Sequence, residues 1–141
     1  MGVRRVPVPE EVYEFAQGDS PGRRKVAAGL AVKPRVWACS GRARHLVPRG
    51  ATAWTLDRDI LVRASLWDEP SVDVAALIAH EIVHTAQWRE NGRVRFIGDY
   101  LRPYFKERVA GFTHWDAYRR IPAEREAFAV QDELRAVFST E

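Results

Sequence analysis

The segment from position 71 to position 92 constrains the fold most, because it carries the signals of one long helix. Ser71 is a preferred N-cap residue, Asp73 falls in the first turn, where negative charge is favourable, and Gly92 follows the last helical position. These signals predict a helix of about twenty residues. Apolar residues fill one side of it, so we expect burial over most of its circumference. They are Ala75, Ile78, Ala79, Ile82, Val83 and Ala86.

This helix carries the pattern H-E-x-x-H from His80 to His84. Two histidines at i and i+4 project from one helix face and can both reach a tetrahedral zinc ion. Glu81 points off that direction and is placed to act as general base on a metal-activated water. The alternative is a histidine pair satisfied in the core or at the surface. It is disfavoured because unpartnered imidazoles are costly to bury in an apolar helix.

A catalytic zinc site needs a third protein ligand. Gln87 and Glu90 stand where the metzincin pattern requires glycine and histidine, which excludes that class. Better candidates lie downstream in "YRRIPAEREAFA", which contains Glu124 and Glu126. Residues two apart on a helix point about 200° from one another, so only one of the two should bind the metal. The apolar stripe of that helix lies between the two glutamates, so the expected burial does not show which of them binds the metal.

Three further residues have two readings each. Tyr118 could donate a hydrogen bond to a tetrahedral oxyanion, or be a packed structural tyrosine. His114 could do the same, or be a loop histidine. Gln87 could form a hydrogen bond to a metal-ligating residue and so orient it, or be an ordinary glutamine on the helix surface.

The rest of the chain predicts short elements in one domain of residues 1–141. A helix is expected through "EEVYEFAQ" after Pro9, while "VAAGLAV" and "RVWAC" could be strands or a helix followed by a strand. "TAWTLDRDILVRAS" predicts a β-hairpin that turns at positions 57–59. Pro103 is expected near a helix start, and Pro122 opens a last helix. The fold class is therefore α+β.

The stretches "AHEIVHTAQWRENGRVRFIGDYL" and "AYRRIPAEREAFA" carry a resemblance. Together they resemble small bacterial metallopeptidase-like proteins with a DUF4157-like domain, and the chain is similar to the minigluzincins. The likeness covers roughly Ala51 to Leu134 and leaves residues 1–50 out. It implies a gluzincin-like minimal fold, with a small antiparallel or mixed sheet packed on the zinc helix and further C-terminal helices. It also implies His80 and His84 as zinc ligands and Glu81 as the base.

The resemblance leaves the third ligand open. In membrane-type gluzincins with an E-x-E-A-D segment the first glutamate binds zinc, whereas in thermolysin-like ones the glutamate directly before alanine does. We expect Glu124, with Glu126 as the alternative. Gluzincins usually carry an acidic residue four positions after the ligating glutamate. Here that position holds Phe128 if Glu124 is the ligand and Val130 if Glu126 is, so the acid is missing in both cases. The partner that orients the zinc-ligating histidine is therefore not identified.

Composition limits the other function classes. The single Cys39 excludes an intramolecular disulfide and a cysteine zinc cluster. No signal peptide or membrane-spanning segment is found, so a cytoplasmic location and no membrane partner are expected. Eight basic residues and no acid lie between positions 23 and 49, which predicts a positive surface. The net charge of only +3 argues against nucleic acid as a partner.

These observations predict a zinc-dependent peptidase in which Glu81 is the base. Its partner would be a peptide or protein, bound in extended form against a sheet edge that we place at residues 59–65. A first alternative is a non-catalytic, peptidase-like zinc-binding module of a larger assembly. A second is anion or nucleic-acid binding through residues 23–49. The preferred cleavage sequence and the oligomeric state do not follow from the sequence.

Overall fold

The computed structural model describes residues 2–48, 51–68 and 71–139 and contains a mixed four-stranded sheet. Its strands are β1 (Gly2–Val6), β2 (Arg35–Ser40), β3 (Ala53–Leu56) and β4 (Asp59–Arg63), in the order β1-β2-β4-β3. The pairs β1–β2 and β3–β4 are antiparallel, whereas β2 and β4 are parallel. The predicted α+β class with a small mixed sheet is confirmed.

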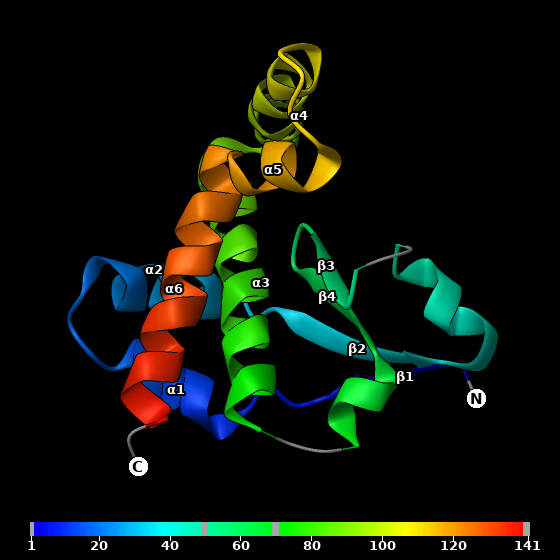
Figure 1. Ribbon diagram of the computed structural model, residues 1–141. Helices are drawn as coiled ribbons and strands as arrows, with labels where there is room; N and C mark the ends of the chain where they lie inside the picture. The colour runs from blue at the N-terminus through cyan, green and yellow to red at the C-terminus, as the bar shows by residue number, and fades with distance from the viewer. Residues whose placement is uncertain (1, 49–50, 69–70, 140–141) are drawn as a thin grey trace.

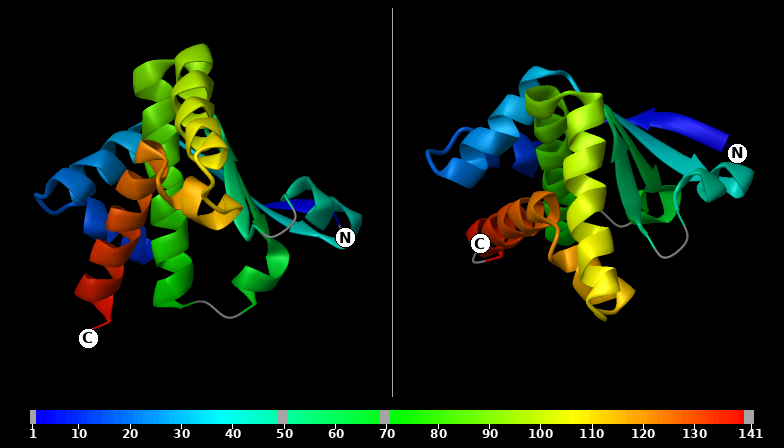
Figure 2. Two further views of the ribbon diagram at one scale, coloured as in Figure 1. Left: turned by 45° about the horizontal axis from the view of Figure 1, so that its top comes forward. Right: turned by 90° about the horizontal axis from the view of Figure 1, so that it is seen from above.

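Six α-helices make up most of the remaining described chain. They are α1 (Glu10–Ala16), α2 (Pro21–Ala31), α3 (Val72–Asn91), α4 (Arg93–Val109), α5 (His114–Arg119) and α6 (Pro122–Phe138). Two 3₁₀ turns, η1 (Gly41–Leu46) and η2 (Ala64–Trp67), flank the β3–β4 hairpin. Figures 1 and 2 show α3 in the middle of the molecule, with the sheet on one side and α1, α2 and α6 on the other. The helices α4 and α5 project from one end.

The central position of α3 explains its apolar composition. Its start is capped as predicted, because the Ser71 hydroxyl accepts a hydrogen bond from the Val74 N–H at 3.3 Å. Nearly every residue from 75 to 87 is buried. On one side α2 approaches so closely that a Cβ atom at Gly29 would collide with the carbonyl oxygen of Ile82. The described part of the N-terminal region that the resemblance left out, residues 2–48, thus contributes to the same hydrophobic core, through Val12, Phe15, Val26 and Val36.

The hairpin prediction is confirmed, with Asp57 and Arg58 between β3 and β4. Asp57 has a φ of 59°, a left-handed conformation that aspartate tolerates better than most residues. The two ambiguous apolar runs separate, because "VAAGLAV" belongs mainly to α2 and "RVWAC" forms β2. The strand β1 was not predicted.

Two sequence predictions are wrong. Pro103 lies inside α4 and not near its start, because Gly92, with a φ of 78°, ends α3 and lets α4 begin at once. The proline leaves one carbonyl of α4 without its helical partner, which a largely exposed helix tolerates because water can replace it. The second error concerns residues 59–65: β4 lies between β2 and β3, so the sheet edge next to α3 is β3. Among the described residues, no helix is long and apolar enough to cross a membrane.

Candidate metal centre

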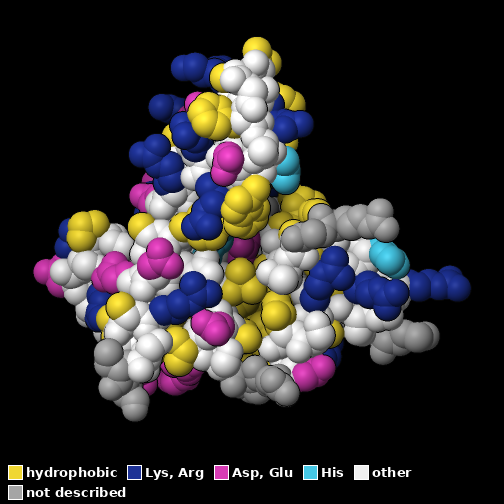
Figure 3. All heavy atoms as spheres, in the orientation of Figure 1, with side chains coloured by type: hydrophobic (Ala, Val, Ile, Leu, Met, Phe, Trp, Pro, Cys, Tyr) yellow, Lys and Arg dark blue, Asp and Glu magenta, His cyan; other side chains and the backbone are white. Residues whose placement is uncertain are grey.

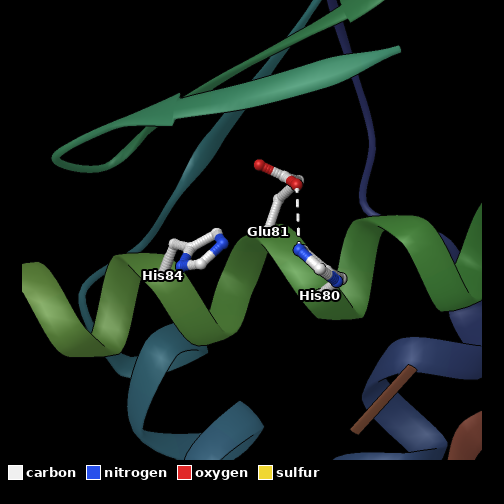
Figure 4. Close-up of side chains that lie close together, drawn as sticks. All are labelled: His80, Glu81 and His84. Carbon is white, nitrogen blue, oxygen red and sulfur yellow. Dashed lines mark ion pairs between the residues drawn. The ribbon is translucent and has the colours of Figure 1, made fainter. Parts of the chain in front are cut away.

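Three buried side chains of α3 gather in the middle of the molecule. His80, Glu81 and His84 each offer a ligand atom, and these atoms lie within 4.8 Å of one another. Figure 4 shows the two imidazoles one turn apart, with the Glu81 carboxylate reaching toward the strands of the hairpin. The relative exposures of the three residues are only 3–5%. Ionisable groups buried to this degree need partners.

The first partner comes from α6, which packs along α3. Glu124 lies in the first turn of α6 and is itself buried. Its Oε1 is 2.9 Å from His80 Nε2, and its Oε2 is 3.0 Å from His84 Nε2. The structure therefore brings together two imidazole nitrogens and one carboxylate from two helices.

The other nitrogen of each imidazole contacts a glutamine amide. His80 Nδ1 is 2.8 Å from Gln131 Oε1, and His84 Nδ1 is 2.8 Å from Gln87 Oε1. The Gln87 amide is oriented by its own Nε2, which donates to the Ala123 carbonyl at 3.0 Å. Since an amide oxygen only accepts hydrogen bonds, each Nδ1 carries the hydrogen. In the neutral imidazole, each Nε2 then has a free lone pair.

This arrangement fits a cation. Two Nε2 lone pairs facing carboxylate oxygens at 2.9 and 3.0 Å repel them unless a proton or a metal ion lies among these atoms. Two histidine nitrogens and one carboxylate oxygen are also a donor set that zinc takes in catalytic sites. Anchoring of each ligand histidine through its second nitrogen is typical of such sites.

The pKa shifts have the same cause. Burial by itself lowers the pKa of His84, but the hydrogen bond and charge of Glu124 raise it to about 9. Burial by itself raises the pKa of Glu124, but hydrogen bonds from both histidines lower it below its usual range. Without a metal ion, a proton on His84 supplies the positive charge that this site requires. A metal ion would have to displace that proton.

Two tyrosine hydroxyls border the carboxylate. The Tyr100 hydroxyl of α4 donates to Glu124 Oε2 at 2.5 Å. Tyr118 packs edge-on against Phe128, with ring centroids 6.1 Å apart. Burial, followed by the negative charge of Glu124, raises the pKa of both tyrosines. Both hydroxyls therefore keep their protons and can donate hydrogen bonds.

Glu126 lies outside this group. Its side chain is 47% exposed. It accepts a hydrogen bond from Gln87 Nε2 at 2.8 Å and pairs with Lys25 at 3.5 Å. His114 is exposed too, and its Nδ1 contacts the Tyr104 hydroxyl at 2.7 Å. Of the two glutamates considered as third ligand, only Glu124 contacts the histidines.

The Glu81 carboxylate is held by the edge strand. The Thr55 hydroxyl of β3 is 3.0 Å from Glu81 Oε1, and Glu81 Oε2 lies 3.8 Å from His80 Nε2. Thr52, the residue before β3, lines a cleft of about 560 Å³ that reaches Leu77 and Gln131. The edge strand therefore contacts the centre through Thr55, whereas the cleft reaches it only through Gln131, the partner of His80.

Three residues of this centre were not singled out from the sequence: Thr55, Gln131 and Tyr100. Gln131 lies seven positions, or two helical turns, after Glu124 and so on the same face of α6. That spacing was the available signal for the missing histidine partner. Tyr100 was noted only within the resembling stretch, and its i, i+4 relation to the buried Phe96 marks the inner face of α4.

The basic segment 23–49 does not form one surface. Arg23, Arg24 and Lys25 on α2 form ion pairs with acidic residues, and Arg35 pairs with Asp59 at 2.7 Å. The remaining basic residues near η1 lie on the opposite side of α3 from α2 (Figure 1). They include Arg42 and Arg44, while Arg49 lies outside the described residues.

Replacing Gln131 with alanine is expected to weaken zinc binding by about 10- to 100-fold, because His80 would lose the acceptor that fixes its tautomer and ring orientation. Competition with a chromophoric chelator measures this affinity. Asp132→Ala is the control, because that side chain is 73% exposed on the same helix and should leave the affinity unchanged. An unchanged affinity in the Gln131 variant would show that the amide does not support the histidine.

A family comparison covers part of this centre. Residues 40–92, less than half of the chain, match the family model of the eCIS core domain. This match agrees with the DUF4157-like part of the resemblance. It includes the hairpin and α3 with both histidines, and ends before Tyr100 and Glu124. No curated protein and no solved structure matches the chain.

Proposed function

We propose that the chain is a zinc-dependent peptidase whose metal ligands are His80, His84 and Glu124. The observation that carries this proposal is the convergence of both Nε2 atoms on Glu124, while each Nδ1 is held by a glutamine amide. Bound zinc would supply Lewis acidity, which acidifies water and polarises a carbonyl group. This donor set leaves a coordination position open, as catalysis requires.

The residues around the ligands have distinct proposed roles. Glu81 would take a proton from the attacking water and pass it to the leaving amine, since its carboxylate is near the ligands and Thr55 orients it. Tyr118 would donate a hydrogen bond to the oxyanion, a role that its protonated hydroxyl can perform. Tyr100 would orient Glu124.

The proposed substrate is an extended peptide. One side of β3 pairs with β4, and in the described sheet its other side pairs with no strand. A peptide could add to that side by main-chain hydrogen bonds. Because Thr55 of β3 also contacts Glu81, a peptide bound there would pass close to the proposed base.

Burial favours one alternative. With relative exposures of only 3–5%, His80, Glu81 and His84 are nearly closed to solvent. A structural zinc site of a non-catalytic binding module would be closed in this way. Such a module has no use for a base, so the test must separate zinc binding from turnover.

The test is metal analysis of protein purified without chelator and reloaded with zinc, followed by digestion of a broad peptide library with and without chelator. We expect one zinc per chain, chelator-sensitive cleavage and a lower melting temperature after zinc removal. Absence of zinc after reloading would contradict the whole proposal. Bound zinc without cleavage of any peptide would favour the module.

A further inference from the structure

The projecting arm of α4 and α5 carries an exposed apolar stripe. Five large apolar residues of α4 are spaced three or four positions apart and so share one helix face. Their relative exposures are 88% for Val94, 46% for Ile97, 42% for Leu101, 57% for Phe105 and 88% for Val109. A second face of α4 is turned to the molecule, because Phe96 is buried and Tyr100 contacts Glu124. The stripe therefore serves neither the core nor the metal centre.

The same helix is basic. Residues 93–109 contain five arginines and lysines but only two acidic residues. Three of the basic side chains, at positions 95, 102 and 106, follow one another along the flank of the stripe. Figure 3 shows Lys and Arg side chains projecting along the arm beside hydrophobic ones. The surface that covers the stripe must therefore be both apolar and negatively charged.

We propose, in place of the sequence-based expectation of no membrane partner, that the α4 stripe binds the surface of an anionic lipid bilayer. A basic amphipathic helix lies in the plane of such a surface, with its apolar side chains among the acyl chains and its basic ones among the headgroups. A second copy of the chain is disfavoured, since two basic flanks would repel each other. An acidic protein groove is the other surface that matches this helix, and the vesicle experiments below separate it from a bilayer.

The exposed basic side chains suit mobile lipid headgroups better than a protein surface with acidic residues at fixed positions. Arg93 and Arg95 are 78% and 74% exposed, and within the described part of the chain each forms one surface ion pair, with Asp57 and Asp99 respectively. Such pairs contribute little and are readily exchanged for headgroup contacts. The proposal does not depend on zinc or on peptidase activity, because the stripe shares no side chain with the metal centre.

The test is co-sedimentation of the full chain with phosphatidylcholine vesicles, with and without phosphatidylglycerol. We expect binding at least about tenfold tighter to the anionic vesicles, and weakened by salt. The double variant Leu101→Asp/Phe105→Asp should lose at least about tenfold in affinity, since charge at these positions cannot enter the acyl region. Both residues are exposed, so circular dichroism should show an unchanged fold.

Two further variants complete the design. Arg102→Glu/Lys106→Glu should remove the preference for anionic vesicles. Arg42→Glu/Arg44→Glu, which changes two basic residues outside the arm, should leave binding unchanged. Absence of binding to anionic vesicles would overturn the proposal and leave the stripe to an acidic protein partner. Binding that depends on Arg42 and Arg44 but not on α4 would overturn it too.

Discussion

Replacing Glu81 with glutamine is expected to lower peptide hydrolysis by at least about a hundredfold while zinc binding and fold stay intact. The amide keeps the size of the side chain, and its oxygen can still accept the hydrogen bond from Thr55 that now reaches Glu81 Oε1. What the variant loses is the ability to take up a proton. The measurement is kcat/KM on the best peptide of the library, with zinc content determined on the same sample.

Glu90→Gln is a matched control for this variant, because it makes the same chemical change on the same helix. The Glu90 side chain is 50% exposed and pairs only with Lys25 in the ion pairs described. Its turnover should equal that of the unchanged protein. Equal turnover of the Glu81 variant would instead remove that residue from the reaction and leave the zinc site without a base.

Replacing Glu124 with alanine is expected to reduce zinc affinity by more than about 10- to 100-fold. That is the loss typical when a residue that only hydrogen-bonds to a ligand is removed, whereas this variant removes a ligand itself. Glu126→Ala should lose less, since that side chain reaches the histidines only through Gln87. His84→Ala should abolish zinc binding, and it serves as the reference for the loss of affinity when a ligand is removed. Chelator competition on all three variants provides the affinities.

The ranking of the two glutamate variants decides the third ligand. A large loss only at position 126 would show that the metal lies on the other side of Gln87. Glu124→Ala also leaves two buried imidazoles and the Tyr100 hydroxyl without their common partner. Its thermal unfolding must therefore be measured beside its affinity.

Much of the fold was predictable where local signals agree. The long helix of residues 72–91 has a cap, an apolar face and a terminal glycine, and all three signals lie within its own sequence. The β3–β4 hairpin has a short polar turn between two β-rich runs. The position of β4 inside the sheet was not predictable in this way, because it depends on pairing with β2, a strand distant in sequence.

The residues of the candidate site also divide into those that local spacing indicates and those that depend on how distant helices pack. The H-E-x-x-H spacing is local, so His80, Glu81 and His84 were found at once. Helical phasing could not choose between Glu124 and Glu126, because the choice depends on how α6 packs on α3. The same docking brings Gln131 to His80 from 51 residues away.

That separation determines when the centre can form during folding. The helix α3 alone supplies two imidazoles, but Glu124 and Gln131 reach them only after the chain has passed through the arm and α6 has docked. Contacts so distant in sequence form late, because loop closure must come first. A metal ion would therefore gain all of its ligands only in a chain that is already almost folded. It would stabilise the packing of α6 on α3 late in folding, and would not initiate the formation of either helix.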